Sequence, residues 1–284
     1  MLHRFWGLRS PALKPLSGGM SSKTWLVEDG GLRFVAKKVL PTQIAELLAG
    51  CEVAAALADD GIITGRPVPT IDGRLTVREH GLALLEHVPG RELRGETDQE
   101  QRWMGATLAC VHLAGHPGPG GTTATFLPDW LSPQLPGVAT HPWLVQAIAV
   151  VRAETNPMTL SWSIIHSDPA PEAFVHDEDT GATGLIDWAG ARRGPVLYDV
   201  ASAVMYLGGP REASAFLEAY QGHGPLGPDE LDRLDSFRRF RWAVQGAYFA
   251  WRPAGNNLVG IEDQLENQNG LDRARRGLEE VTLT

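Results

Sequence analysis

The sequence contains little cysteine and no pattern typical of a zinc site. Only two of its 284 residues are cysteine, Cys51 and Cys110, and each lies among Ala, Leu and Val in a segment with a helical pattern. No Cys and His residues follow the spacing that zinc ligands usually have. We therefore predict two buried thiols that behave as small apolar side chains.

Long apolar runs and an excess of positive charge are also missing. The N-terminal stretch MLHRFWGLRS is not apolar enough for a signal peptide, and the longest apolar stretch, WLVQAIAVV at 143–151, is too short to span a bilayer. Acidic residues outnumber Lys and Arg by 34 to 25, and the only dense basic cluster is RRFR at 238–241. Because nucleic-acid and membrane-surface proteins need a basic face, we predict a cytoplasmic protein without such partners. We expect a monomer or a weak dimer.

The hydrophobic pattern divides the chain at Pro89-Gly90. Before it, strand-like runs at 23–29 and 32–40 meet at Gly30-Gly31, a helical pattern covers 42–61, and two or three further strands follow within 67–88. After it, helical patterns dominate, interrupted by one hairpin pattern. With 43% apolar residues, the chain can bury a sizeable core. We predict an α+β protein with an N-terminal antiparallel β-sheet lobe carrying one helix, residues 1–89, and a larger, mainly helical lobe, residues 90–284.

A glycine- and serine-rich turn precedes the first of these strands. In LSGGMSSKTWLV, Gly18, Gly19, Ser21 and Ser22 lie where backbone N–H groups can approach phosphate oxygens without obstruction by a Cβ atom. Taken alone, the pattern is more typical of an ordinary loop.

Two adjacent lysines follow on the next strand. Lys38 follows Ala36 by two positions, so both are predicted to face the glycine-rich turn, and a compact ammonium group suits phosphate oxygens. We expect Lys38 in this role, whereas a register shift of one residue assigns it to Lys37. Glu52, in the following helix, is predicted to pair with the lysine, and Glu46 is a rival on a similar helical face. Solvated surface positions are the alternative for both glutamates.

The stretch IIHSDPAPEAFVHDEDTGATGLIDW contains two aspartates that are candidates for catalysis and metal binding. Asp168 follows an apolar strand-like run, and Asp187 ends the second strand of the next hairpin. One carboxylate can accept a proton from a hydroxyl, and the other can hold Mg²⁺. Judged by spacing alone, the pattern is somewhat more typical of two turn aspartates.

The order of these motifs resembles the aminoglycoside phosphotransferase family of the kinase-like superfamily, which has relatives among choline kinases and one class of homoserine kinases. The resemblance covers about residues 15–252, and LIDW followed by RGPVLYDVA is its most specific part. It implies a two-lobed protein-kinase-like fold that binds ATP and Mg²⁺ as cofactors.

The resemblance also implies roles for individual residues. The backbone around Glu86 and Val88 would hold adenine, and the phosphates would lie under Gly18, Gly19, Ser21 and Ser22. Lys38 would contact phosphate and pair with Glu52, Asp168 would be the catalytic base, and Asp187 would bind the metal. His166 and Asp199 would be structural, tying the catalytic loop to the segment after the metal aspartate.

The loop departs from the family pattern at two positions. The family usually has His-Gly-Asp, four further residues and then Asn, whereas this chain has Ser167 and Ala173 at the glycine and asparagine positions. Alanine offers no oxygen ligand, which puts a second metal site in doubt. Glu172 is the candidate replacement ligand, and a solvent-facing side chain is its alternative. Pro169 and Pro171 stiffen the loop and remove two N–H donors.

Together these features predict an ATP-dependent kinase that transfers the γ-phosphoryl group to a hydroxyl of a small acceptor. Aminoglycosides, amino alcohols, sugars and homoserine-like molecules are the candidates, and the acidic surface is compatible with a cationic one. The alternative is a nucleotide-binding, kinase-like module with lost or weak catalysis. Acceptor-binding candidates lie in the larger lobe: the segment 115–142 with Trp130, and the aromatic helix with Trp242, Tyr248 and Trp251. For these aromatic residues, core packing is the alternative.

Overall fold

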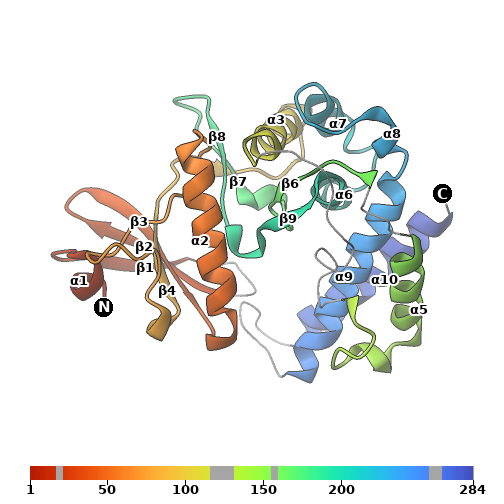
Figure 1. The fold of residues 1–284 in the computed structure, drawn as a ribbon, viewed down its shortest axis with the longest axis horizontal. Helices are drawn as coiled ribbons and strands as arrows, with labels where there is room; N and C mark the ends of the chain where they lie inside the picture. The colour runs from red at the N-terminus through yellow and green to blue at the C-terminus, as the bar shows by residue number, and fades with distance from the viewer. Residues whose placement is uncertain (17–21, 116–130, 155–158, 256–263, 284) are drawn as a thin grey trace. The chain divides into compact units, whose positions relative to one another are not determined.

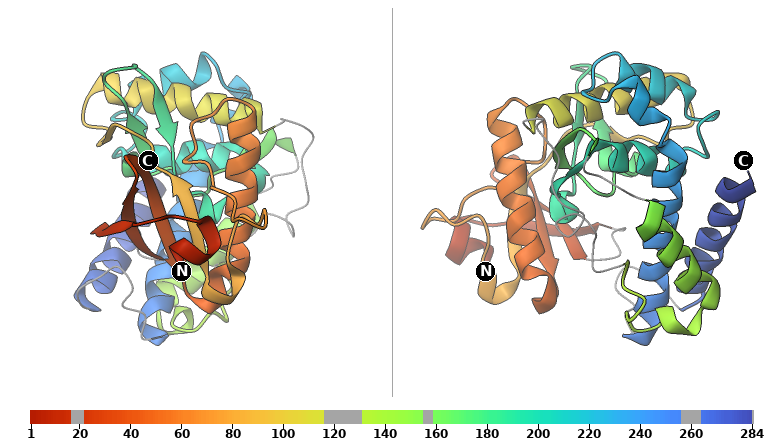
Figure 2. Two further views of the ribbon diagram at one scale, coloured as in Figure 1. Left: turned by 90° about the vertical axis from the view of Figure 1, so that its left-hand side faces the viewer. Right: turned by 45° about the vertical axis from the view of Figure 1, so that its right-hand side comes forward.

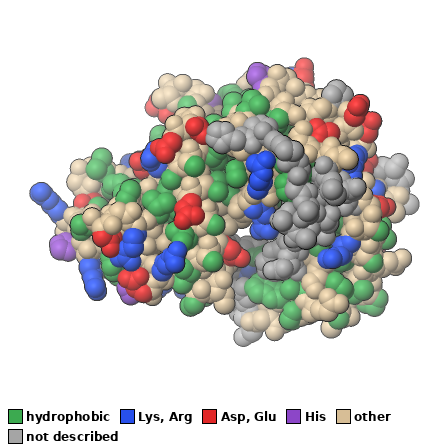
Figure 3. Space-filling model, in the orientation of Figure 1, with side chains coloured by type: hydrophobic (Ala, Val, Ile, Leu, Met, Phe, Trp, Pro, Cys, Tyr) green, Lys and Arg blue, Asp and Glu red, His purple; other side chains and the backbone are tan. Residues whose placement is uncertain are grey.

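A computed structural model describes residues 1–16, 22–115, 131–154, 159–255 and 264–283, which form two compact units. The first unit contains Met1–Arg94 and Pro171–Arg192, and the second contains Gly95–Ala170 and Arg193–Thr284. None of the described helices is both long and apolar enough to cross a membrane. On the face shown in Figure 3, acidic and basic side chains are interspersed among apolar ones.

An antiparallel sheet forms the centre of the first unit. Its strands β1 (Ala12–Leu16), β2 (Ser22–Asp29), β3 (Leu32–Val39) and β4 (Leu82–Glu86) lie side by side in chain order (Figure 1). Gly30 and Gly31, with φ of 58° and 82°, form the turn predicted between β2 and β3, because two successive positive φ angles are what a two-residue hairpin turn requires. Of the strands predicted within 67–88, only β4 forms in full.

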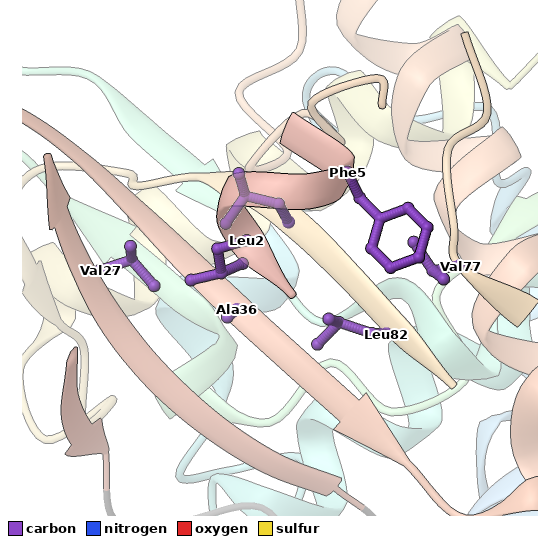
Figure 4. Packing of buried hydrophobic residues seen from close by; sticks show 7 residues of the cluster. Leu2, Phe5, Val27, Ala36, Val77 and Leu82 are labelled. Carbon is purple, nitrogen blue, oxygen red and sulfur yellow. The ribbon is translucent and has the colours of Figure 1, made fainter. Parts of the chain in front are cut away.

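The two faces of this sheet bury different side chains. On one face, Ala36 and Val27 pack with Leu2 and Phe5 of α1 (Leu2–Trp6) in the cluster drawn in Figure 4. On the other face, Val39 and Ala83 pack against Leu47 and Cys51 of α2 (Ile44–Asp59). Because side chains alternate along a strand, the odd-numbered residues of β3 face α2.

The segment Pro171–Arg192 packs with the first unit through its own small sheet. Strands β5 (Arg91–Glu92), β7 (Phe174–His176) and β8 (Thr183–Leu185) pair in that order, and the Leu185 N–H donates to the Ile63 carbonyl at 2.9 Å. The short 3₁₀ helices η6 (Pro171–Ala173) and η7 (Trp188–Gly190) flank this hairpin. The sequence predicts two continuous lobes, 1–89 and 90–284, whereas the first unit also includes residues 171–192. The reason is that backbone hydrogen bonds join this late segment to β5 and to Ile63, which lie far from it in the sequence.

The second unit is mainly helical, as the sequence predicts. Its longer helices are α3 (Asp98–Ala114), α5 (Pro142–Glu154), α6 (Val196–Tyr206), α7 (Ser214–Gln221), α9 (Leu234–Ala254) and α10 (Gln264–Leu283), with α8 (Pro228–Leu231) as a single turn. The strands β6 (Trp162–Ile165) and β9 (Arg192–Pro195) pair with each other. Helix α9 packs against α5, α6 and α10 (Figure 2), and α6 is buried along nearly its whole length. Thr97 precedes α3 as its N-terminal cap, and its side chain accepts the Glu100 N–H at 3.2 Å.

Candidate active site

A largely apolar pocket lies within the first unit. Its walls come from β3, α2, the end of β4 and the turn after β8, and they include Val35, Lys37, Leu47, Gly50, Cys51, Ala54, Leu85, Glu86, Val88, Ile186, Asp187 and Trp188. Lys37 and Asp187 are the oppositely charged pair among these walls, and their side chains form an ion pair. An apolar pocket with a few convergent polar groups is the usual form of a small-molecule site.

The structure places Lys37 in this pocket, and not Lys38 as expected from the sequence. The Lys37 side chain is 7% exposed beside Asp187, whereas Lys38 is exposed. The prediction took Ala36 as the marker of the phosphate side. Ala36 instead belongs to the cluster with Leu2 on the far face of the sheet (Figure 4), so Lys38, which shares its side of the strand, points away from α2.

The expected pairing of Glu52 with the lysine is also corrected. Among the described residues, neither Glu52 nor Glu46 forms an ion pair with Lys37, and both glutamates are exposed. The α2 residues that line the pocket are Leu47, Gly50, Cys51 and Ala54. This spacing of three, four and seven residues defines one helical face, and at 100° per residue Glu52 lies nearly opposite it.

Close approach of α2 to the Asp187 turn depends on Gly50. A Cβ atom at this position would overlap the backbone oxygen of Trp188, the residue that follows Asp187. Asp187 itself has φ of 71° and ψ of 61°, a left-handed conformation that aspartate tolerates better than most residues. The strained turn therefore presents the Asp187 carboxylate to the pocket, and such strain clusters at functional sites.

Cys51 is buried in the same wall, as predicted. Burial raises the pKa of its thiol to about 11, although the positive charge of Lys37 opposes the shift. Cys110 is exposed and so differs from the sequence prediction. Its position on the outer side of α3 explains the difference, since the neighbours Ala109 and Val111 are buried.

The donor set near Asp187 fits a Mg²⁺ ion only with help from a bound nucleotide. Ala173 is buried at the position where the family pattern has asparagine, and its carbonyl accepts the Ile186 N–H at 2.9 Å. Glu172 is exposed, and no group of three or more His, Cys, Asp or Glu side chains in the described part of the chain could hold a metal. Mg²⁺ can nevertheless bind through one or two carboxylates together with phosphate oxygens and water, so Asp187 remains a suitable protein ligand.

The linker after β4 contributes Val88 to the pocket wall. The Glu86 N–H donates to the Arg66 carbonyl at 2.8 Å, whereas the Val88 N–H has no hydrogen bond to any part of the chain that the structure describes. Ser22 is buried at the start of β2. Gly18, Gly19 and Ser21 lie outside the described residues.

In the second unit, a buried carboxylate fixes the loop after β6. Asp199 of α6 accepts the His166 N–H at 2.6 Å and the Ser167 N–H at 2.8 Å, and its own side chain is fully buried. His112 Nε2 lies 3.2 Å from the same carboxylate, and Tyr220 Oη lies 2.7 Å from His112 Nδ1. Burial, followed by the negative charge of Asp199, raises the pKa of Tyr220 well above its ordinary value. The contacts agree with the structural role expected for Asp199.

Asp168 extends from this loop toward α6 and α9. Its side chain is 60% exposed, and its Oδ1 atom accepts the Tyr206 hydroxyl at 2.6 Å. The same oxygen accepts a hydrogen bond from the guanidinium of Arg241, a buried residue of α9. Burial alone would lower the pKa of Arg241, but Tyr198, Tyr206 and Asp168 outweigh it, and the pKa is raised.

Comparison with known proteins places this arrangement in a family. A family model described as APH, phosphotransferase enzyme family, matches residues 12–235. The chain belongs to this family. It is 26% identical to a homoserine kinase of Caulobacter vibrioides over 94% of this chain and 91% of that protein. A homoserine kinase of Caulobacter sp. strain K31 is also 26% identical, over 94% and 90%.

Solved structures of small-molecule kinases share the fold. A microcompartment-associated aminopropanol kinase has a TM-score of 0.70 at 19% identity, covering 98% of this chain and 93% of that one. A choline kinase from Streptococcus pneumoniae has a TM-score of 0.68 at 16% identity, with 94% of each chain covered. Spectinomycin phosphotransferase in complex with ADP and spectinomycin has a TM-score of 0.65 at 13% identity, with 100% and 97% covered. The predicted fold class and the predicted phosphotransferase acting on an alcohol group are confirmed, and membership of a kinase family implies the use of ATP.

The aromatic candidates for acceptor binding on α9 divide into two kinds. The ring of Trp242 packs where a Cβ atom at Gly277 of α10 would lie, so it is a packing residue. The Tyr248 hydroxyl accepts a hydrogen bond from the buried Arg252 at 2.8 Å, and its ring lies 6.3 Å from that of Trp251. Burial raises the pKa of Tyr248, although Arg252 opposes the shift. Trp130 lies outside the described residues, as does most of the segment 115–142.

Sequence reasoning missed Arg241 and Tyr206 as neighbours of Asp168. A signal for Arg241 was present, because it lies on the same helical stripe as Leu234, Phe237 and Val244, which are all buried. A charged residue on the buried face of a helix is almost always paired. The pattern does not identify the partner, which comes from a loop 73 residues away.

Proposed function

We propose that the chain transfers the γ-phosphoryl group of ATP to the hydroxyl of a small amino alcohol or hydroxy amino acid, with homoserine as the first candidate. The observation that carries the proposal is the burial of Lys37 against Asp187 in a largely apolar pocket. The near full-length similarity to homoserine kinases supports the choice of acceptor, and the fold shared with aminopropanol and choline kinases supports the wider class.

Under this proposal, a few residues of the first unit bind the nucleotide and its metal ion. The Val88 N–H would donate to the adenine ring, and the Lys37 ammonium would bind phosphate oxygens. Asp187 would hold Mg²⁺ together with phosphate oxygens and water, and the ion would neutralise charge on the phosphates. Glu172 is a further metal ligand under this proposal only if its exposed side chain turns toward the nucleotide. Ser22 and the preceding Gly18, Gly19 and Ser21 would surround the phosphates.

Asp168 of the second unit would act on the acceptor. Its carboxylate would orient the hydroxyl and accept its proton as the bond to phosphorus forms. Such proton transfer contributes about 10²–10⁴-fold to a rate, and positioning and electrostatic stabilisation supply most of the rest in phosphoryl transfer.

A phosphorylation assay tests this proposal. Purified protein is incubated with ATP and Mg²⁺ and with homoserine, aminopropanol, choline, a sugar or spectinomycin, and the phosphorylated product is identified by mass spectrometry. We expect product with an amino alcohol or homoserine, a loss of at least about 10²-fold in Asp168→Ala, and a comparable loss in Lys37→Met. Lys38→Met is the matched control, since its side chain is exposed, and should keep the wild-type rate. Equal turnover in wild type and Asp168→Ala would overturn the assignment of Asp168.

The absence of an oxygen ligand at Ala173 favours one second candidate, a nucleotide-binding module with lost or weak catalysis. It is distinguished by a Mg²⁺-dependent increase in melting temperature with ATP, without phosphorylated product from any acceptor in the panel. Ala173→Asn restores the family residue. If the chain is such a module, this variant should gain measurable turnover.

A further inference from the structure

The two oxygens of the Asp168 carboxylate have different surroundings. Both of its donors, the Tyr206 hydroxyl and the Arg241 guanidinium, bind Oδ1. The Oδ2 atom has no hydrogen bond within the described part of the chain. Because the side chain is 60% exposed, Oδ2 is the oxygen that a small molecule can reach.

Arg241 is held firmly on the side away from the solvent. Its Nε atom donates to the Ser202 hydroxyl of α6 at 2.8 Å, and its guanidinium lies 6.0 Å and 5.8 Å from the ring centres of Tyr198 and Tyr206. The side chain is only 7% exposed. A buried guanidinium that extends from α9 and is held against α6 restricts the carboxylate that it binds, because little rotamer freedom remains to either group.

We propose that Arg241, assisted by Tyr206, is a positioning residue that fixes the Asp168 side chain so that Oδ2 faces the acceptor hydroxyl. This inference rests on the proposed function, in which Asp168 accepts the hydroxyl proton. An exposed aspartate without such donors samples several staggered side-chain conformations. Since a displacement of about 1 Å in a reacting group can cost about 10²-fold in rate, the hydrogen bonds to Oδ1 control how often Asp168 is productively placed.

A double-mutant cycle on the full-length protein tests the inference. Steady-state kinetics with ATP, Mg²⁺ and the acceptor identified in the panel are measured for Arg241→Lys, Tyr206→Phe and Asp168→Ala, and for the two combinations with Asp168→Ala. Arg241→Lys keeps the charge but loses the planar, forked geometry. We expect a fall in kcat of about 10–10²-fold, with KM for ATP unchanged. Tyr206→Phe removes the hydroxyl that donates to the Asp168 carboxylate and accepts from Arg241 at 3.2 Å, and should lower kcat by at least about fivefold.

Arg238→Lys is the matched control. Arg238 lies on the same helix, its side chain is also 7% exposed, and it pairs with Asp235 at 2.7 Å. This variant should keep the wild-type kcat, although it disturbs the helix to a similar degree.

The decisive result is the effect in the Asp168→Ala background. If Arg241 and Tyr206 act through Asp168, their substitutions should not change the residual rate of Asp168→Ala, because effects on one functional unit are not additive. A wild-type kcat in Arg241→Lys, or an equal fold-loss with and without Asp168, would overturn the inference and leave the proposed function intact. Wild-type turnover in Asp168→Ala would instead overturn the proposed function. Should Arg241→Lys fail to fold, the Tyr206→Phe cycle gives the same decision, since it removes a single hydroxyl.

Discussion

Substituting either member of the Lys37–Asp187 ion pair removes the same contact, but the structure predicts unequal losses of stability. The Lys37 side chain is 7% exposed and that of Asp187 is 49% exposed. Asp187→Asn leaves a buried ammonium without its carboxylate, and the loss of one partner of a fully buried pair costs about 3–5 kcal/mol. Because Asp187 is half-exposed, we expect a smaller loss of about 2–3 kcal/mol. Lys37→Met leaves a carboxylate that water can solvate and should cost at most about 1 kcal/mol.

Urea unfolding of the ligand-free protein measures this difference. A gap of about 2 kcal/mol corresponds to midpoints about 0.7 M apart at a slope of about 3 kcal/mol per M. Lys38→Met serves as the control and should unfold within about 0.5 kcal/mol of wild type, since it is a surface substitution. Equal losses in the two variants, or a larger loss in Lys37→Met, would refute the reasoning from burial.

Three further predictions concern single positions in the two units. Ser167 has φ of 75°, a conformation that glycine adopts without strain, so the free energy of unfolding of Ser167→Gly should exceed that of Ser167→Ala by about 1 kcal/mol. Gly50→Ala forces a Cβ atom against the Trp188 backbone and should lower the free energy of unfolding by about 1–3 kcal/mol. The same variant should bind ATP more weakly in calorimetry. Because the pKa of Cys51 is raised from 9.0 to about 11, its thiolate fraction below pH 9 is reduced about 10²-fold, and iodoacetamide should label the exposed Cys110 first.

The raised pKa of Cys51 also determines the pH range in which the free energy of unfolding declines. The folded state disfavours the Cys51 thiolate, so the contribution of the protonated thiol is complete below pH 9.0 and is lost as the pH rises toward about 11. Cys51→Ala should remove this part of the alkaline decline in the urea midpoint. Equal labelling of the two cysteines would contradict the prediction for iodoacetamide, and an unchanged alkaline decline in Cys51→Ala would contradict the pH prediction. Wild-type stability in Gly50→Ala would contradict the prediction from close packing.

The sequence predicts correctly those elements of the fold that depend on residues adjacent in the chain. The turn at Gly30-Gly31 depends on two adjacent residues and forms as predicted. The other strands expected within 67–88 do not form, because the residues before β4 meet it only at the isolated bridges Pro67↔Leu85 and Val77↔Leu82. Whether an extended segment joins a sheet depends on the strand beside it, which local patterns do not contain.

In the candidate site, too, the residue types could be predicted from the sequence, whereas the choice among neighbouring residues depends on tertiary packing. Lys37 and Lys38 are equivalent in the sequence, and the choice between them depends on which face of the sheet α2 covers. Glu52 was chosen by residue type, but the rotation of α2 turns Leu47, Gly50 and Cys51 toward the pocket. Both errors arise from tertiary packing and not from the chemistry expected of the residues.

The contact between Asp199 and the loop after β6 has a consequence for how this loop can evolve. The carboxylate binds the backbone N–H groups of His166 and Ser167 and neither of their side chains. Every residue except proline has such a group, so a substitution at position 167 leaves the anchor of the loop in place. A residue other than glycine can therefore precede Asp168, as Ser167 does, and keep this backbone anchor, although its positive φ carries a conformational cost.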